Sequence, residues 1–535
     1  MMFPGRRPIL LLLNGDIHTM DPDKPRATAL AVDRASGRIV AVGDDAEIRG
    51  LAGPLTDTLD LHGRVALPGF IDAHTHLLHT ARARLNVDLR TTHSEDEAVA
   101  LVRQRAERTP PGAWIVGQSW DKNQWTPQQF PTKAALDGAT PDHPVALSSH
   151  DFHSLWVNSA ALHRAGIDAQ TPDPLAGRIE RDASGEPTGM LFEGEAMALV
   201  ERVITPADDE TLRHELRQVL AELRARGVTG VHNIEDAHSL RLMQRLRDEG
   251  GLGLRLLLYI PRASLGEALR LGLTADFGDD WLRFAGIKVF MDGALGSQTA
   301  AMLGAYEGRP DNLGLLTTSE AEITQTVRAA ADGGVGVAIH AIGDRAVKTA
   351  LDGIETILHR RAQGGAPADA LASVARRFRL EHVQLARPED INRMAALGVI
   401  ASVQPFHAVV DRYTAERYWG ARYKRAYAYE TMRRTGVRLA LGSDMPVDTA
   451  DPLRILHAAV ARRNDETPNA PPWLPDQALS VADALRAYTV GAAYAGGQES
   501  RQGSLAPGKL ADLVVLNDDP FTLPAERLAG AEVAA

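Results

Sequence analysis

Eight short apolar runs, most of them separated by helical segments, constrain the fold of this chain more than any other feature. Strands of parallel sheets are buried on both faces and give continuous apolar runs, and their alternation with helices is the pattern of βαβ units. Eight units predict an α/β fold with a (β/α)8 barrel (TIM barrel), whose strands all end on one face. The candidate strands are residues 69–76, 228–233, 254–260, 284–292, 335–340, 378–382, 399–404 and 437–444.

One of the intervening helices is marked at both ends. Ser319 and Glu322 have the spacing of a capping box, an apolar-periodic stretch follows, and Gly333-Gly334 provides a stop signal. We therefore predict a helix between Ser319 and Gly333.

The two ends of the chain differ from this pattern. Residues 8–67 alternate short apolar runs with Gly, Asp and Pro, and residues 503–516 have the same character. We expect both ends to build one small β-sandwich domain, from residues 1–67 and 487–535. The barrel would span 68–486, with a long insertion after its first strand, at 78–225, that lies over the barrel mouth.

Composition narrows the possible partners and ligands. The chain has 535 residues and a formal net charge of −11, which disfavours nucleic acid as a partner. It has no cysteine, so a metal would need nitrogen and oxygen ligands. Arg6-Arg7 precedes an apolar run that is too short for a signal peptide or a membrane span, so we expect a strand there and a cytoplasmic protein. A small-molecule substrate is expected, and homodimerisation is left open.

Six polar residues stand where apolar strands should end. His74 and His76 are two positions apart at a strand end, so their side chains point the same way and could grip one metal. Taken alone, the pair could equally be two surface histidines. The other four are Lys288, His340, His382 and Asp444.

Each of these four also has an ordinary explanation. Lys288 could form a structural salt bridge, or burial could lower its pKa so that it reacts with carbon dioxide and becomes a metal-bridging carbamate. A histidine at a strand end is often a satisfied core residue, and Asp444 could be a helix N-cap. Their joint occurrence at successive strand ends favours a metal site.

Motifs along most of the chain resemble those of the metal-dependent amidohydrolase superfamily, in the branch of YtcJ-like proteins and N-substituted formamide deformylases (amidohydrolase family 3). The segments are LPGFIDAHTH, GQSWD, HDFHSLWVNSAAL, GIKVFMDGALGSQTA, HAIGDRA, RLEHVQL, SVQP, LGSDMPV and GSLAPGKLADLVVL. The resemblance implies two divalent ions, one on His74 and His76, the other on His340 and His382. Carboxylated Lys288 would bridge them, and Asp444 would bind metal and the nucleophilic water.

The sequence also suggests residues around the metals. We expect Trp120, His153, Asp292 and Gln404 to bind substrate, and Glu381 to point away from the site because it neighbours His382. Zinc is the first choice of metal, with manganese, iron and cobalt left open.

The expected activity is hydrolysis of a non-peptide carbon–nitrogen bond in a small amide or formamide, by a hydroxide that bridges the metals, with Asp444 as general base and then general acid. A deaminase of the same superfamily is the alternative enzyme. A non-catalytic barrel scaffold is the alternative outside enzymes.

Overall fold

The computed structural model describes residues 8–363 and 378–535. Arg6-Arg7 lies outside these ranges, and so does the stretch at 366–371, whose Pro and Ala residues predict a loop. The central body is one eight-stranded parallel sheet whose strands follow each other in chain order, so the predicted barrel is confirmed. Its strands are β8 (Phe70–Thr75), β15 (Val228–Ile234), β16 (Arg255–Pro261), β17 (Leu282–Phe290), β18 (Gly336–Ala341), β19 (Phe378–His382), β20 (Ile400–Val403) and β21 (Leu439–Leu441).

The first and last strands meet at a seam that closes the barrel. Thr75 forms a parallel bridge with Met445, and the Asp444 N–H donates to the His74 carbonyl at 2.8 Å. β21 is shorter than the predicted 437–444, since it ends at Leu441, and Asp444 beyond it has a left-handed φ of 60°. This seam brings candidate ligands from distant parts of the sequence together.

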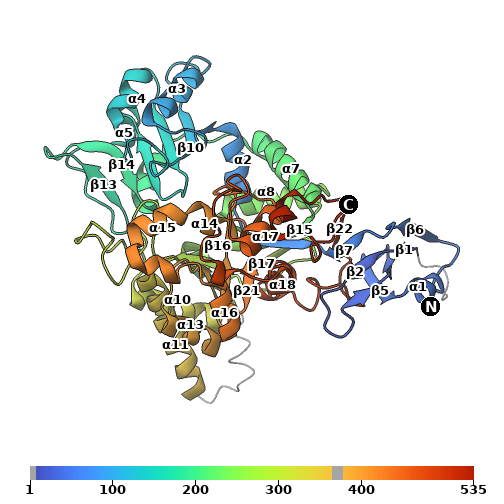
Figure 1. Cartoon of the computed structure of the whole chain (residues 1–535). Helices are drawn as coiled ribbons and strands as arrows, with labels where there is room; N and C mark the ends of the chain where they lie inside the picture. The colour runs from blue at the N-terminus through green and yellow to red at the C-terminus, as the bar shows by residue number, and fades with distance from the viewer. Residues whose placement is uncertain (1–7, 364–377) are drawn as a thin grey trace.

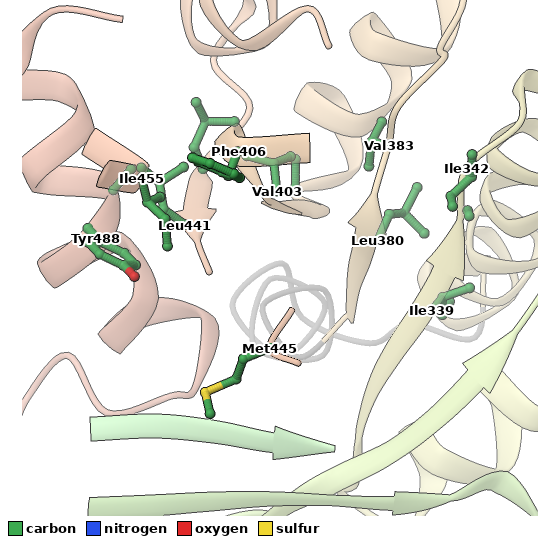
Figure 2. Packing of buried hydrophobic residues seen from close by; sticks show 14 of the residues in the cluster. Ile339, Ile342, Leu380, Val383, Val403, Phe406, Leu441, Met445, Ile455 and Tyr488 are labelled. Atoms are coloured by element: carbon green, nitrogen blue, oxygen red, sulfur yellow. The ribbon is translucent and has the colours of Figure 1, made fainter. Parts of the chain in front are cut away.

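Helices cover the outside of the barrel and bury the outward faces of the strands. The predicted capping box is present on α10 (Glu320–Asp332), where Ser319 and Glu322 bond to each other's backbone and Gly333 follows the last turn. Figure 2 shows Ile339, Leu380, Val403 and Leu441, from four successive strands, within one continuous apolar cluster. Other covering helices are α8 (Ala237–Asp248), α9 (Leu265–Arg270), α11 (Asp344–Gln363), α13 (Pro388–Leu397), α16 (Tyr429–Thr435) and α17 (Pro452–Ala461).

The insertion after β8 contains a sheet of its own. Helices α2 (Leu77–Leu85) and α7 (Asp209–Ala225) pack on each other, and α7 also contacts β15. α7 buries one leucine-rich face there, so both helices belong to the outer layer of the barrel. The residues between these two helices form a six-stranded mixed sheet, which Figure 1 shows apart from the small β domain that contains the N-terminus. Its elements are β9 (Val87–Asp88), α3 (Glu95–Ala106), β10 (Ile115–Trp120), α4 (Lys133–Ala139), β11 (Val145–Ser149), β12 (Ser154–Val157), α5 (Ser159–Ala165), β13 (Arg178–Arg181), β14 (Pro187–Phe192) and α6 (Gly194–Glu201).

Both chain ends build the small β domain, as predicted. It has two four-stranded sheets, and β22 (Leu513–Leu516) near the C-terminus pairs with β7 (Val65–Pro68). Before β22 in the sequence, helix α19 (Ala492–Ala495) packs on strands β8 and β21 of the barrel. No helix among the described residues is long and apolar enough to cross a bilayer. The remaining strands are β1 (Ile9–Leu13), β2 (Asp16–His18), β3 (Arg26–Ala27), β4 (Ala29–Asp33), β5 (Arg38–Gly43) and β6 (Thr56–Asp60).

Candidate metal centre

The structure brings the six predicted ligands together where the barrel strands end. His76 Nε2 lies 3.1 Å from Asp444 Oδ1, and His74 Nε2 lies 3.4 Å from the same oxygen. These three side chains can each offer one atom to a single ion. Asp444 precedes no helix, so its interpretation as an N-cap is wrong.

The other three residues lie directly beside this group. Lys288 Nζ is 3.4 Å from His74 Nε2. The rings of His340 and His382 are 4.5 Å apart between centroids, and His382 Nδ1 is 3.9 Å from Asp444 Oδ2. All three are buried, with 3% to 4% of their surface exposed. The set thus forms one compact group of nitrogen and oxygen donors.

Hydrogen bonds orient all four histidine rings. Each ring has one nitrogen bonded to an oxygen acceptor, which leaves the other nitrogen available as a metal ligand. The acceptors are Glu381 Oε2 for His74 Nδ1 (2.6 Å), the Ile234 carbonyl for His76 Nδ1 (2.7 Å), the Gly293 carbonyl for His340 Nε2 (3.1 Å) and Gln404 Oε1 for His382 Nδ1 (2.8 Å).

The electrostatics of the group suit divalent cations. Burial lowers the pKa of His74, His340 and His382 well below the ordinary value, so these imidazoles are neutral, the form that binds metal. Burial opposes ionisation of Asp444, but the hydrogen bond and charge of His76 outweigh it and lower the carboxyl pKa. The donors therefore fit the nitrogen and oxygen ligands preferred by zinc and similar ions.

Lys288 does not make the structural salt bridge that was its simpler explanation. Among the described residues no carboxylate forms an ion pair with it, and its near contacts are the His74 ring nitrogen and the Phe290 ring. Burial lowers the pKa of its amine to about 8, although the charges of Glu381 and Asp444 oppose this shift. A buried amine with this pKa has an accessible neutral form.

The expectation that Glu381 points away from the site is wrong. Its side chain is fully buried beneath the site, where it accepts a hydrogen bond from His74 and pairs with Arg379 Nε at 2.5 Å. The expectation relied on strand alternation, but His382 has φ of 73°, in the left-handed region. This backbone turn lets Glu381 and His382 both face the barrel axis.

Asp292 and Gln404, which were expected to bind substrate, both make hydrogen bonds within the protein. Asp292 is completely buried and accepts hydrogen bonds from the backbone N–H groups of Ala301, Ile342 and Gly343, so it ties together two loops at the barrel mouth. Gln404 is occupied by the His382 ring. Each also lies beside a candidate ligand, because Asp292 Oδ1 is 3.7 Å from His340 Nε2 and Gln404 Oε1 is 2.8 Å from His382 Nδ1.

Trp120 and His153 stand on the insertion side of the site. Trp120 is 1% exposed, stacks within an aromatic cluster, and donates its indole N–H to the Leu147 carbonyl, so most of its surface stabilises the insertion. His153 Nδ1 is 2.9 Å from Glu193 Oε2, and its ring lies 5.2 Å from the His340 ring. His153 is therefore the closer of the two to the candidate ligands.

A cavity of about 610 Å³ connects the insertion with the barrel mouth. His340, His382 and Asp444 line one part of it, and residues that follow insertion strands β10 and β11 line another. This volume is within the usual range of small-molecule sites. The insertion sheet thus forms part of the wall of the candidate active site.

A second polar group lies in this cavity and was not predicted from the sequence. His407 Nε2 lies 3.8 Å from Asp444 Oδ2 and 3.6 Å from Asp448 Oδ2, and His150 Nε2 lies 3.7 Å from Asp448 Oδ1. His407, His382 and Asp444 also form a second triplet that could hold an ion. The position of His407, just beyond the end of the predicted strand 399–404, could have identified it as a site residue.

Comparison with known proteins agrees with this geometry. A family model described as "Amidohydrolase family" matches residues 57–535. The chain belongs to the amidohydrolase family. It is 34% identical over 526 residues to "Protein LONG AFTER FAR-RED 3" of Arabidopsis thaliana, with 96% of this chain and 88% of that protein covered.

Two further similarities bear on the site. N-substituted formamide deformylase of Arthrobacter pascens is 32% identical over 525 residues, with 96% of this chain and 94% of that protein covered. The crystal structure of an uncharacterized metal-dependent hydrolase from Pyrococcus horikoshii OT3 superposes with a TM-score of 0.75 at 28% identity, covering 97% of this chain and 99% of that one. The resemblance on which the sequence analysis relied is thus confirmed.

Proposed function

We propose that this chain is a metal-dependent hydrolase that cleaves a carbon–nitrogen bond in a small, non-peptide amide or formamide. The observation that carries this proposal is the convergence of four histidines, one lysine and Asp444 in the buried barrel mouth. The relative named N-substituted formamide deformylase supports the choice of bond.

The residues divide naturally between two ions. His74, His76 and Asp444 would hold one, His340 and His382 would hold the other, and Lys288, whose Nζ lies 3.4 Å from His74 Nε2, would be shared between them. Bound divalent ions would polarise the substrate carbonyl and make an attacking water more acidic. Zinc is our first choice, and manganese, iron or cobalt would also accept these donors.

Asp444 is the proton carrier in this proposal. It is ionised, because its pKa is lowered, and it lies on the cavity wall with one oxygen directed at His76. As a base it would accept the proton of the attacking water, and as an acid it would return that proton to the departing amine. A substrate carbonyl in the surrounding cavity would lie beside this carboxylate.

Lys288 would act as a carbamate. Its amine nitrogen would bond to the carbon of carbon dioxide and release a proton, which gives two oxygen ligands close to His74. The absence of an ion pair among the described residues, together with burial, supports this assignment. Carbon-13 bicarbonate added to the protein should give a carbamate resonance that disappears in Lys288→Met, and an unchanged spectrum would oppose the proposal.

A substrate screen tests the proposed reaction. Metal-supplemented protein should hydrolyse at least one member of a panel of N-substituted formamides, acyl amides, hydantoin-like rings and esters, and Asp444→Asn should not. Release of ammonia from an aminated ring, without hydrolysis of any amide, would favour the deaminase alternative. Lack of both activities in protein that binds no metal would favour a non-catalytic scaffold.

A further inference from the structure

A buried lysine lines the cavity on the insertion side. Lys122 follows the end of β10 and is 3% exposed, yet it belongs to the wall of the cavity that also reaches His340, His382 and Asp444. Its ammonium group donates to Asn123 Oδ1 at 3.0 Å and to the Tyr418 hydroxyl at 3.0 Å. None of the proposed catalytic steps uses this charge.

The charge of Lys122 has no ionic partner within the part of the chain that the structure describes. Both of its hydrogen-bond acceptors are neutral, and its Nζ also lies 4.6 Å from the centre of the Phe130 ring and 5.2 Å from that of the Tyr418 ring. Arg454, on the same cavity wall, is held by Asp465 and Glu466. A buried ammonium without a carboxylate is costly, and aromatic faces offset only part of that cost.

The surroundings hold the ammonium group in place. The Tyr418 hydroxyl donates to Asn123 Oδ1 at 2.8 Å, so that lysine, tyrosine and asparagine form a closed triangle. Asp121 accepts from the Asn123 amide at 2.9 Å and fixes its orientation. Since an ammonium has three protons and two are used here, one donor remains for a ligand.

We propose that Lys122 is an anion subsite that binds a carboxylate of the substrate. This inference rests on the proposed function, and it narrows the substrate to an amide or formamide that carries a carboxylate away from the scissile bond, as an N-acyl amino acid does. Arg90 also lines the cavity, but it is exposed and donates to the Pro446 carbonyl, so Lys122 is the buried cation there, which suits one negative charge. The acidic side chains of Asp121, Asp151 and Asp448 on the same wall would repel a more highly charged group.

Ligand binding to the metal-loaded protein tests this subsite without requiring turnover. Calorimetry would compare hexanoate, hexanol and hexylphosphonate on the wild type, Lys122→Met, Lys122→Gln and Lys122→Arg. Loss of a charge-assisted hydrogen bond should weaken hexanoate binding roughly tenfold or more in the Met and Gln variants, while hexanol binding stays unchanged. The Arg variant should retain most of the affinity.

The control is Lys133→Met, which removes a positive charge from the same insertion at a position outside the cavity wall. It should bind hexanoate like the wild type. Equal hexanoate affinity in the wild type and in both neutral Lys122 variants would overturn the proposal, as would undetectable hexanoate binding to the wild type. Tighter binding of hexylphosphonate than of hexanoate would contradict the carboxylate assignment and would indicate a phosphate-like group instead. If the Lys122 variants weaken hexanoate binding as expected but no amide is hydrolysed in the substrate screen, only the proposed reaction is refuted.

Discussion

At the scale of single residues, the site depends on side chains that hold the candidate metal ligands in place without binding metal themselves. His74 is oriented by Glu381, which is itself paired with Arg379. Arg379 also donates to the Ala73 carbonyl and contacts His232 Nδ1 at 2.7 Å. This buried network fixes the ring whose Nε2 lies 3.4 Å from both Lys288 Nζ and Asp444 Oδ1.

Replacing Glu381 tests that network. Glu381→Gln should weaken metal binding about 10- to 100-fold, because partners of this kind orient the ligand and raise its basicity. Competition with a chelator of known affinity would measure the change. The control is Glu389→Gln, an exposed residue of the same type eight positions along. Wild-type metal affinity in Glu381→Gln would show that the contact plays no part in binding.

Asp444 should be essential to turnover but not to the fold. Asp444→Asn keeps the size of the side chain and removes its ability to accept a proton. Turnover of the best substrate should fall by about 10²- to 10⁴-fold, while metal content by elemental analysis stays largely intact. Wild-type turnover in this variant would exclude Asp444 as the proton carrier.

The His153–Glu193 pair predicts a pH dependence of stability. Burial lowers the His153 pKa, but the charge and hydrogen bond of Glu193 outweigh it and raise the pKa to about 9, above the ordinary 6.5. The pair should therefore stabilise the fold fully below pH 6.5 and lose this contribution as the pH rises through about 9. The loss should be roughly 1.5–3 kcal/mol.

Thermal unfolding of wild type and Glu193→Gln at a series of pH values would measure this effect. The difference in Tm between the two proteins should be largest at pH 6, below the ordinary His153 pKa of 6.5. It should shrink toward pH 9.5, above the raised pKa of about 9. A constant difference, or one that widens with pH, would contradict the assignment of the pair.

Sequence patterns located the six candidate ligands but not their supports. A polar residue that ends an apolar strand is visible in the sequence, and His74 and Asp444 were found in this way. The role of Glu381 was hidden, because it depends on the left-handed backbone of His382. Such a conformation in a residue other than glycine is imposed by tertiary packing, which no local pattern records.

At the scale of elements, the barrel requires close backbone approach between β17 and β18. Gly286 lies opposite Gly336 in the parallel ladder. A Cβ added at Gly286 would collide with the backbone of Gly336, which cannot move aside as the end of a flexible side chain could. Lys288 lies two residues further along the same strand, so this packing also positions a candidate ligand.

Gly286→Ala should therefore destabilise the fold by about 1–3 kcal/mol or more. Chemical denaturation followed by circular dichroism would measure the free energy of unfolding. Gly230→Ala is the control, because Gly230 is a buried barrel glycine in β15 whose added Cβ would meet the nearest side chain, Ile71, at an ordinary 3.6 Å. Equal stability of both variants would contradict the close-approach argument.

The elements themselves were largely predictable. All eight barrel strands and the helix after Ser319 lie where apolar runs and capping signals placed them. The six-stranded sheet within the insertion was not predicted, because its aromatic and polar residues lack a clear period. Trp120 was expected to bind substrate. It borders the cavity, but it is 1% exposed and its indole N–H is bonded to the Leu147 carbonyl, so it also belongs to the core of that sheet.

At the scale of the whole molecule, the cavity is shared between two units of the chain. The barrel provides the candidate ligands, and the insertion provides Lys122, His150 and His153 on the facing wall. Which insertion residues face the barrel depends on how the two units pack, so the sequence could not select them. We propose that the insertion sets substrate choice while the barrel provides the chemistry.

The metal content of the purified protein tests the central claim most directly. Protein expressed without added metal, then analysed for elements and assayed before and after chelation, should contain two transition-metal ions per chain and lose activity with them. Lys288→Met should lose at least one ion. Full activity in chelator, in protein that contains no transition metal, would contradict the account.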